Sequence, residues 1–215
     1  MRAPSAVGAT IPGGMGGIVP IAGASVGAAL VAGFTLLVAG MHAEGALLAV
    51  RNTARFSSVV FVVALLASSS DHGTDLAGVG SRFRALAARR VPLVRSFVAA
   101  HLVHYGAVLF QMFVNPLARR HPLSVAGSVV LAFGLTLVLL IAFTSAARTR
   151  AQAAWNRIAL WAAAASFLLA LVFGASRGHR IDVALSALVA AASAASAWLL
   201  LRARAPAAAS PDPAP

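Results

Sequence analysis

Six long runs of apolar residues, separated by short stretches that carry most of the charge, dominate this sequence. The clearest run extends from Ile18 to Met41 and has no charged residue in 24 positions. A helix needs about 20 consecutive apolar residues to cross the hydrocarbon core of a bilayer. The chain is 60% hydrophobic and only 10% charged, which leaves too few polar residues to give each helix a wet face. The sequence therefore predicts an all-α integral membrane bundle with the lipid bilayer as its surroundings.

The apolar runs predict six transmembrane helices joined by short loops, within a transmembrane domain of residues 18–204. The second run is short, and extending it back to about Leu47 brings Arg51 and Arg55 into the outer end of its helix. Residues 1–17 and 205–215 are rich in small residues and proline and are predicted to be disordered. The six predicted spans are approximately 18–41, 47–70, 93–114, 122–145, 155–174 and 182–201.

The basic residues, which are all arginines, set the predicted orientation. Eleven of the 17 fall on the side that holds the N-terminus, the 71–95 segment, the 146–157 loop and the C-terminal tail. Loops rich in positive charge stay in the cytoplasm, so both termini are predicted to lie there, with the chain in a bacterial-type cytoplasmic membrane. These arginines also account for the formal charge of +12, and no nucleic-acid partner is expected.

Two histidines in the third predicted span are the strongest candidates for chemistry. His101 and His104 are three residues apart and so project from one face of a helix. A titratable group at this depth costs about 2.5–3.5 kcal/mol even on the lenient insertion scale, so its presence asks for a reason. Neutral imidazole is a common ligand of haem iron, and at most one of two histidines a turn apart is an axial ligand. The alternative is that both only bond neighbouring helices.

Other polar residues have weaker claims. Arg51 and Arg55 either hold haem propionates by charge-assisted hydrogen bonds or extend to phosphate headgroups. Tyr105 and Gln111 are polar bridges or packing residues. The remaining candidates are interpreted as boundary residues near the outer surface (His42, Glu44, His121 and His179) and as a polar turn rather than a metal site (Asp71, His72 and Asp75). With no Cys, the chain has no disulfides, thiolate chemistry or Cys-held iron–sulfur or zinc sites.

Three segments, in this order and spacing, resemble the ferric reductase-like transmembrane domain family and the related haem-bearing subunits of methionine sulfoxide reductase systems. The segments are RNTARFSSVVFVVALLASS (51–69), ARRVPLVRSFVAAHLVHYGAVL (88–109) and AFTSAARTRAQAAWNRIALW (142–161). The T-A-R-x-S and F-x-x-x-H-x-x-H patterns carry most of the resemblance, which covers the second to the sixth span. It implies a cytochrome b-like bundle that binds haem b between histidines on different helices and passes electrons across the membrane. His101 and His104 match the family's third-helix histidines.

The chain departs from this family pattern in the fifth predicted span. Family members typically carry a His shortly after the Trp that opens this helix, but here the stretch reads WNRIA (155–159), and Ala159 stands in its place. A haem would therefore be ligated by His101 or His104 with a non-standard or missing second ligand. If the chain is part of an enzyme, it is a membrane oxidoreductase subunit that needs a separate electron donor.

Two alternative functions remain open at the level of the sequence. One is a haem-free structural or partner-binding membrane protein that keeps the bundle. The other is a small transporter that uses the histidine pair as a proton relay. Against the transporter stand the absence of internal repeats and broken helices and the expectation that no acidic residue lies within a span.

Overall fold

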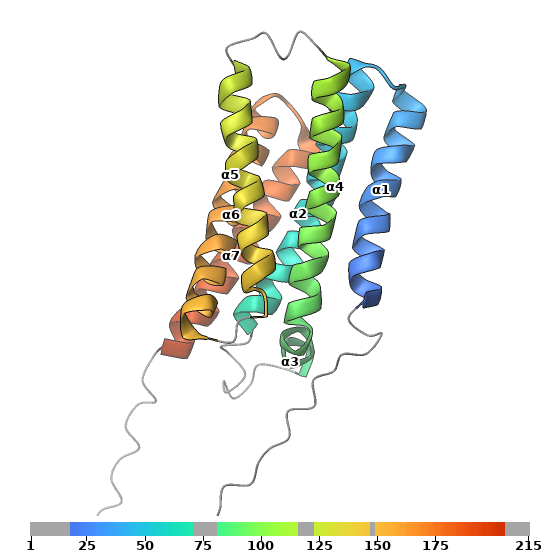
Figure 1. Ribbon diagram of the computed structural model, residues 1–215. Coiled ribbons are helices and arrows are strands. Elements are labelled where there is room, and N and C mark those ends of the chain that lie inside the picture. Colours follow the sequence, from blue (N-terminus) through green and yellow to red (C-terminus); the bar gives the residue numbers. More distant parts are fainter. Residues whose placement is uncertain (1–17, 71–80, 116–122, 147–148, 205–215) are drawn as a thin grey trace, which may run out of the picture.

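The computed structural model describes residues 18–70, 81–115, 123–146 and 149–204 of the chain. These residues are 93% helical and contain no strand, which confirms the predicted all-α class. The long helices run side by side, and the short α3 lies at the end of the bundle where α1 begins and α7 ends (Figure 1). The helices are α1 (Ile18–Ala39), α2 (Ala43–Ser70), α3 (Ser81–Ala88), α4 (Arg90–Val114), α5 (Leu123–Thr144), α6 (Arg150–Ser176) and α7 (Arg180–Arg204).

Within the described ranges, five helices are long and apolar enough to cross a membrane, namely α1, α2, α4, α6 and α7. In α5 the apolar stretch whose side chains are described, Ala132–Thr144, is shorter than a span. Bulky apolar side chains cover the outside of the bundle, and Leu37 and Phe143 are 81% and 82% exposed. Soluble monomers rarely expose contiguous apolar surface on this scale. The surroundings that suit these helices are therefore a lipid bilayer.

Helix limits differ from the predicted ones mainly where capping sets them. The helix predicted from residue 155 begins at Arg150, because Thr149 and Gln152 form a capping box. The Thr149 hydroxyl accepts from the Gln152 N–H at 3.1 Å, and the Gln152 side chain accepts from the Thr149 N–H at 3.2 Å. Helix α2 begins at Ala43 rather than near residue 47, and α3 was not predicted. The predicted disordered ends, 1–17 and 205–215, lie outside the described residues.

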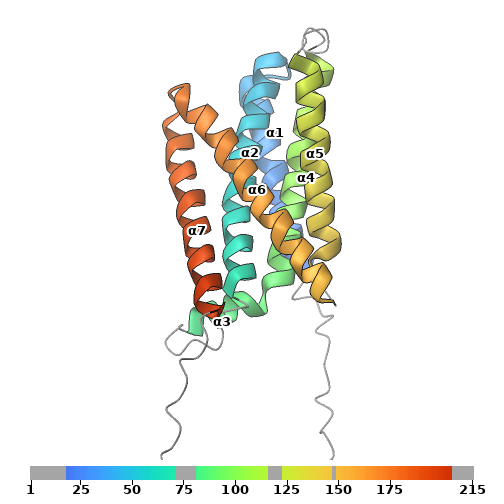
Figure 2. The same ribbon diagram turned by 90° about the vertical axis from the view of Figure 1, so that its left-hand side faces the viewer.

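Five helices, α2, α4, α5, α6 and α7, form a closed ring in which each helix contacts the next. Helix α1 lies outside this ring against α2 and α4. Helix α6 crosses the bundle obliquely, so that its first turns lie near α5 and its last turns near α7 (Figure 2). As a result α5 and α6 diverge toward the end where α6 gives way to α7, which is called the α6–α7 end below.

Three phenylalanines form an aromatic cluster inside the ring of helices. Phe61 of α2 lies with its ring centroid 5.0 Å from those of Phe97 of α4 and Phe167 of α6, and the last two are 6.0 Å apart. Phe61 and Phe97 are fully buried. Ala159 is also fully buried in this core, where α6 packs through small residues. The aromatic cluster fills part of the interior of the ring, and a cavity lies next to it toward the α6–α7 end.

The turn between α1 and α2 depends on a glycine in the first turn of α2. A Cβ on Gly45 would collide with the carbonyl oxygen of Gly40, which itself has a φ of +87°. Because the obstacle is backbone rather than a flexible side chain, we expect Gly45→Ala to lower the free energy of unfolding by about 1–3 kcal/mol. The measurement is an SDS unfolding titration in mixed micelles. Gly33→Ala is the control, since a Cβ there meets open space, and equal losses in both variants would contradict the prediction.

Candidate functional site

A cavity of about 470 Å³ lies between α2, α4, α5 and α6 and reaches the start of α7. This volume is within the range of small-molecule and cofactor sites. Most of its lining is apolar, with Phe97 and Phe167 of the aromatic cluster among the lining residues. The polar side chains that line it are those of Arg51, Arg55, His101, His104, Tyr105, Ser166, Arg177, His179 and Asp182. The structure thus brings the predicted histidine pair and both predicted arginines to one cavity.

Each histidine of α4 is held by a hydroxyl of α2. His104 Nδ1 lies 3.1 Å from Thr53 Oγ1, and His101 Nδ1 lies 3.0 Å from Ser57 Oγ. The two hydroxyl residues are four apart on α2 and face histidines that are three apart on the antiparallel α4. Thr53 and Ser57 are the Thr and Ser of the T-A-R-x-S segment, and both are fully buried. The histidines therefore have fixed partners on one neighbouring helix.

The hydroxyl protons determine which imidazole nitrogen carries the hydrogen. Thr53 donates to the Ala49 carbonyl at 2.7 Å, and Ser57 donates to the Ala54 carbonyl at 3.1 Å. A hydroxyl has one proton, so toward the imidazole each oxygen acts as an acceptor. We therefore assign the proton of both neutral imidazoles to Nδ1. The lone pair is then on Nε2, and the backbone of Val50 is a second hydrogen-bond partner of the His104 ring.

The two imidazoles differ in how tightly other rings enclose them. The centroid of His101 lies 4.9–5.4 Å from four other rings, those of Phe97, His104, Tyr105 and Phe167. Apart from His101, the only ring in contact with His104, within the part of the chain that the structure describes, is Tyr105 at 5.8 Å. His104 is also one helical turn nearer the α6–α7 end. Of the two, His104 is the more available to a molecule in the cavity.

The wall that faces the histidines comes from α6 and provides little for a metal. Its lining residues include Ala163, Phe167 and Ala170. Ser166, the polar member, donates its hydroxyl proton to the Ala162 carbonyl at 2.9 Å. Ala159, where the resemblance expects a histidine, lies in the packed core and does not line the cavity. No group of three or more His, Cys, Asp or Glu side chains that could hold a metal ion occurs within the described ranges.

An ion pair that the sequence did not predict lies at the α6–α7 end of the cavity. Arg55 Nε donates to Asp182 Oδ1 at 2.6 Å, and Asp182 is only 4% exposed. Arg55 Nη1 also donates to Asn52 Oδ1 at 3.3 Å, and the Asn52 amide donates to Thr35 Oγ1 at 3.2 Å. This chain of contacts connects α7, α2 and α1.

Asp182 corrects the expectation that no acidic residue lies within a span, because the candidate span Arg180–Leu201 contains it. Its position in the first turn of α7 resembles that of a solvated boundary residue, and its partner Arg55 is 127 positions away, so no local pattern reveals the pair. The absence of a side chain at Gly174 makes room for the carboxylate, since a Cβ there would collide with Asp182 Oδ2.

The two predicted arginines have different surroundings. Arg55 is engaged by Asp182, whereas Arg51, one turn closer to the start of α2, has no hydrogen-bond or ion-pair partner within the described residues. Arg177, which also lines the cavity, is exposed at the end of α6. Because the Asp182 carboxylate offsets the charge of Arg55, the remaining charge at this end of the cavity is positive.

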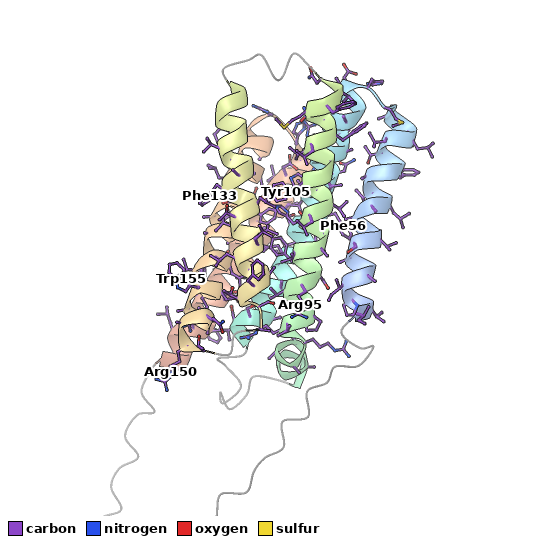
Figure 3. The ribbon with its side chains drawn as sticks, viewed as in Figure 1. Phe56, Arg95, Tyr105, Phe133, Arg150 and Trp155 are labelled. Atoms are coloured by element: carbon purple, nitrogen blue, oxygen red, sulfur yellow. The ribbon has the colours of Figure 1, made fainter. Side chains whose placement is uncertain are left out.

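The other candidates from the sequence are placed as follows. Tyr105 lines the cavity, and its hydroxyl approaches α5 at Gly134, where a Cβ would collide with it (Figure 3). His179 also lines the cavity. Outside the cavity, Gln111 lies near the end of α4, His42 accepts a 3.4 Å hydrogen bond from the Gly45 N–H, and Glu44 lies in the first turn of α2. Asp71, His72, Asp75 and His121 lie outside the described residues.

Comparisons of the chain with protein-family models, with curated proteins and with solved structures give no match. The interpretation of the site therefore depends on its own geometry and on the resemblance in the three segments. Sequence reasoning did not find the roles of Thr53, Ser57 and Asp182. For the first two there was a signal, because hydroxyls spaced i, i+4 on one helix suit histidines spaced i, i+3 on an antiparallel neighbour.

Proposed function

We propose that this protein is a multi-pass membrane subunit that binds one b-type haem in the cavity and transfers electrons, as its resemblance to ferric reductase-like proteins implies. The observation that carries the proposal is the 3.1 Å contact between Thr53 Oγ1 and Nδ1 of His104, a residue that lines the cavity. With the proton assigned to Nδ1, the lone pair of Nε2 is left for an iron. A ligating histidine usually donates its other ring N–H to an orienting partner in this way.

The cavity suits a haem that is ligated from one side. Its apolar walls match the body of a porphyrin, and Arg51 supplies a cation for a propionate. The facing wall of α6 has no second ligand for the iron. When bound, the haem supplies one-electron chemistry. The residues of the chain orient the imidazole through Thr53, keep water away through Phe167 and its apolar neighbours, and offset the propionate charge through Arg51.

We also propose six membrane passes, with α5 as the additional one. Helix α5 has 22 residues, and at 1.5 Å per residue it is about 33 Å long, enough for the hydrocarbon core. The start of α1 and the end of α7 lie at the same end of the bundle (Figure 1). The arginine surplus on this side supports an orientation with both termini in the cytoplasm of a bacterial-type cell. Electrons would come from a separate soluble or membrane-bound partner protein.

Absorption spectra of the detergent-purified protein, oxidised and then reduced with dithionite, test this proposal. We expect a Soret band that shifts on reduction and is lost in His104→Ala, because that variant removes the iron ligand. Thr53→Val should weaken haem binding by about 10–100-fold, since the imidazole loses its orienting acceptor. His42→Ala, outside the cavity, is the control and should keep the band. A colourless wild-type protein from haem-replete cells would overturn the proposal.

The second candidate is a haem-free bundle with a structural or partner-binding role. The observation that favours it is the α6 wall, where alanines and Phe167 face the histidines and no second axial ligand is present. A small transporter has less support. The aromatic cluster fills the ring of helices on the α3 side of the histidines, so the cavity offers no continuous polar path across the bundle.

A further inference from the structure

We infer that the cavity takes up its ligand sideways from the bilayer, between α5 and α6, and that Arg51 binds a carboxylate on that ligand. The inference rests on the proposed function only in treating the cavity as a ligand site. The ligand class is a membrane-dissolved apolar body that carries a carboxylate. A haem propionate and the head of a fatty acid share this chemistry, and the experiment below separates them.

The side chains that line the cavity on α5 and α6 also form part of the outer surface. Val130 of α5 is 70% exposed, and Phe173 of α6 is 59% exposed, yet both line the cavity. Ala170 of α6 is likewise exposed and lines the cavity. A residue that faces both the cavity and the outside marks an opening between the two. Figure 2 shows α5 and α6 diverging toward the α6–α7 end, and the side chains that both line the cavity and are exposed there include the apolar Val130 and Phe173. We therefore infer that the opening leads into lipid rather than water.

The charge at the cavity points to an anionic group on the ligand. Arg55 is neutralised by Asp182 at 2.6 Å, whereas Arg51 has no counter-charge within the described residues. A guanidinium beside apolar walls binds an anion more strongly than in water because the local dielectric constant is low. Its planar fork matches the two oxygens of a carboxylate.

Tyr105 adds a second polar group at the same cavity. No hydrogen bond to its hydroxyl is found among the described residues, although the residue is half-buried and lines the cavity. Buried tyrosine hydroxyls usually have a partner. A carboxylate held by Arg51 would give this hydroxyl an acceptor, provided that the ligand reaches across to α4. Two donors without partners at one apolar cavity therefore favour an acceptor-bearing ligand over a hydrocarbon.

The test uses the full-length protein in phosphatidylcholine nanodiscs and two probes. Radiolabelled oleate reports a lipid carboxylate by equilibrium binding, and haem reports propionates by Soret titration. We expect Arg51→Ala to weaken binding about tenfold or more, the loss of a charge-assisted hydrogen bond. Arg51→Lys, which keeps the charge, should retain most of the affinity. Arg95→Ala is the matched control, because Arg95 is exposed near the other end of α4 and does not line the cavity.

A pair of α6 variants tests the sideways route. Ala170→Phe places a ring at the opening. It should lower the association rate of whichever probe, oleate or haem, binds the wild-type protein several-fold. Ala165→Phe adds the same ring to an exposed position of α6 that does not line the cavity, and should leave the rate unchanged. Monodisperse elution and an unchanged circular dichroism spectrum establish that each variant is folded. Equal rates in the two variants would overturn the route between α5 and α6.

Each pattern of affinities has one meaning. If haem binding depends on Arg51, both the inference and the haem proposal are supported. If only oleate binds and its affinity depends on Arg51, the inference is supported and the haem proposal fails. If haem binds equally well to Arg51→Ala, the haem proposal survives and the inference is overturned. If the folded protein binds neither probe, the inference is overturned as well.

Discussion

Replacement of Asp182 by alanine is expected to lower the free energy of unfolding by about 3–5 kcal/mol, the usual cost of removing one partner of a buried ion pair. The Arg55 side chain is only 18% exposed, and its Nε donates to Asp182 at 2.6 Å, so the guanidinium would remain without a counter-charge. The contact also connects the start of α7 to α2. The measurement is an SDS unfolding titration of the purified protein in mixed micelles.

Two further variants show whether the loss comes from the unpaired charge. Arg55→Leu together with Asp182→Leu should recover most of the stability, since apolar replacement of both partners is often neutral or better. Arg51→Leu is the matched control, because it removes an arginine of the same helix that has no partner within the described residues. We expect its effect to stay below about 1 kcal/mol. A loss in Asp182→Ala no larger than this would show that the ion pair does not hold α7 in place.

The second large effect is expected for Phe61→Ala, with a loss of about 2–4 kcal/mol, somewhat below the usual range for a buried Phe in a soluble protein. Lipid tails are as apolar as the protein interior, so little transfer energy is lost. What is lost is packing against Phe97 and Phe167, whose ring centroids each lie 5.0 Å from that of Phe61. The void left behind has no partner atoms on one side. The same SDS titration measures the loss.

Phe34→Ala is the control for the aromatic cluster. Phe34 lies on α1 and is 69% exposed on the outside of the bundle, so its removal exchanges protein atoms for lipid and leaves no void. We expect a change of less than about 1 kcal/mol. Similar losses in the two phenylalanine variants would mean that the aromatic cluster is not the centre of packing.

Hydropathy predicted the helical class and most of the helix limits, because the length of an apolar run is a local property of the sequence. It placed α1, α4, α5 and α7 to within about three residues of the observed ends. It missed the early start of α6, although Thr149 and Gln152 have the residue types and spacing of a capping box. It also missed α3, which is too short and too polar for a span. A prediction that follows only the lengths of apolar runs detects neither helix caps nor short amphipathic helices.

The candidate site was predicted in part. His101 and His104 were singled out by the cost of burying them, and the structure places both at one cavity. Their partners on α2, and the Arg55–Asp182 pair, come from the packing of helices that are far apart in sequence. Residue type alone gave Arg51 and Arg55 the same role. Their surroundings separate them, because only one of them meets a carboxylate.

The two hydroxyl–imidazole contacts also have a mechanical consequence. Thr53 and Ser57 are about 6 Å apart along α2, and His101 and His104 are about 4.5 Å apart along α4. Sliding α2 along α4 by one turn would leave at least one histidine without its hydroxyl partner, because two hydroxyls face two histidines. The two contacts therefore lock the helices at a single register. A rotation of α2 away from α4 would break both contacts, because Thr53 and Ser57 lie on one face of α2.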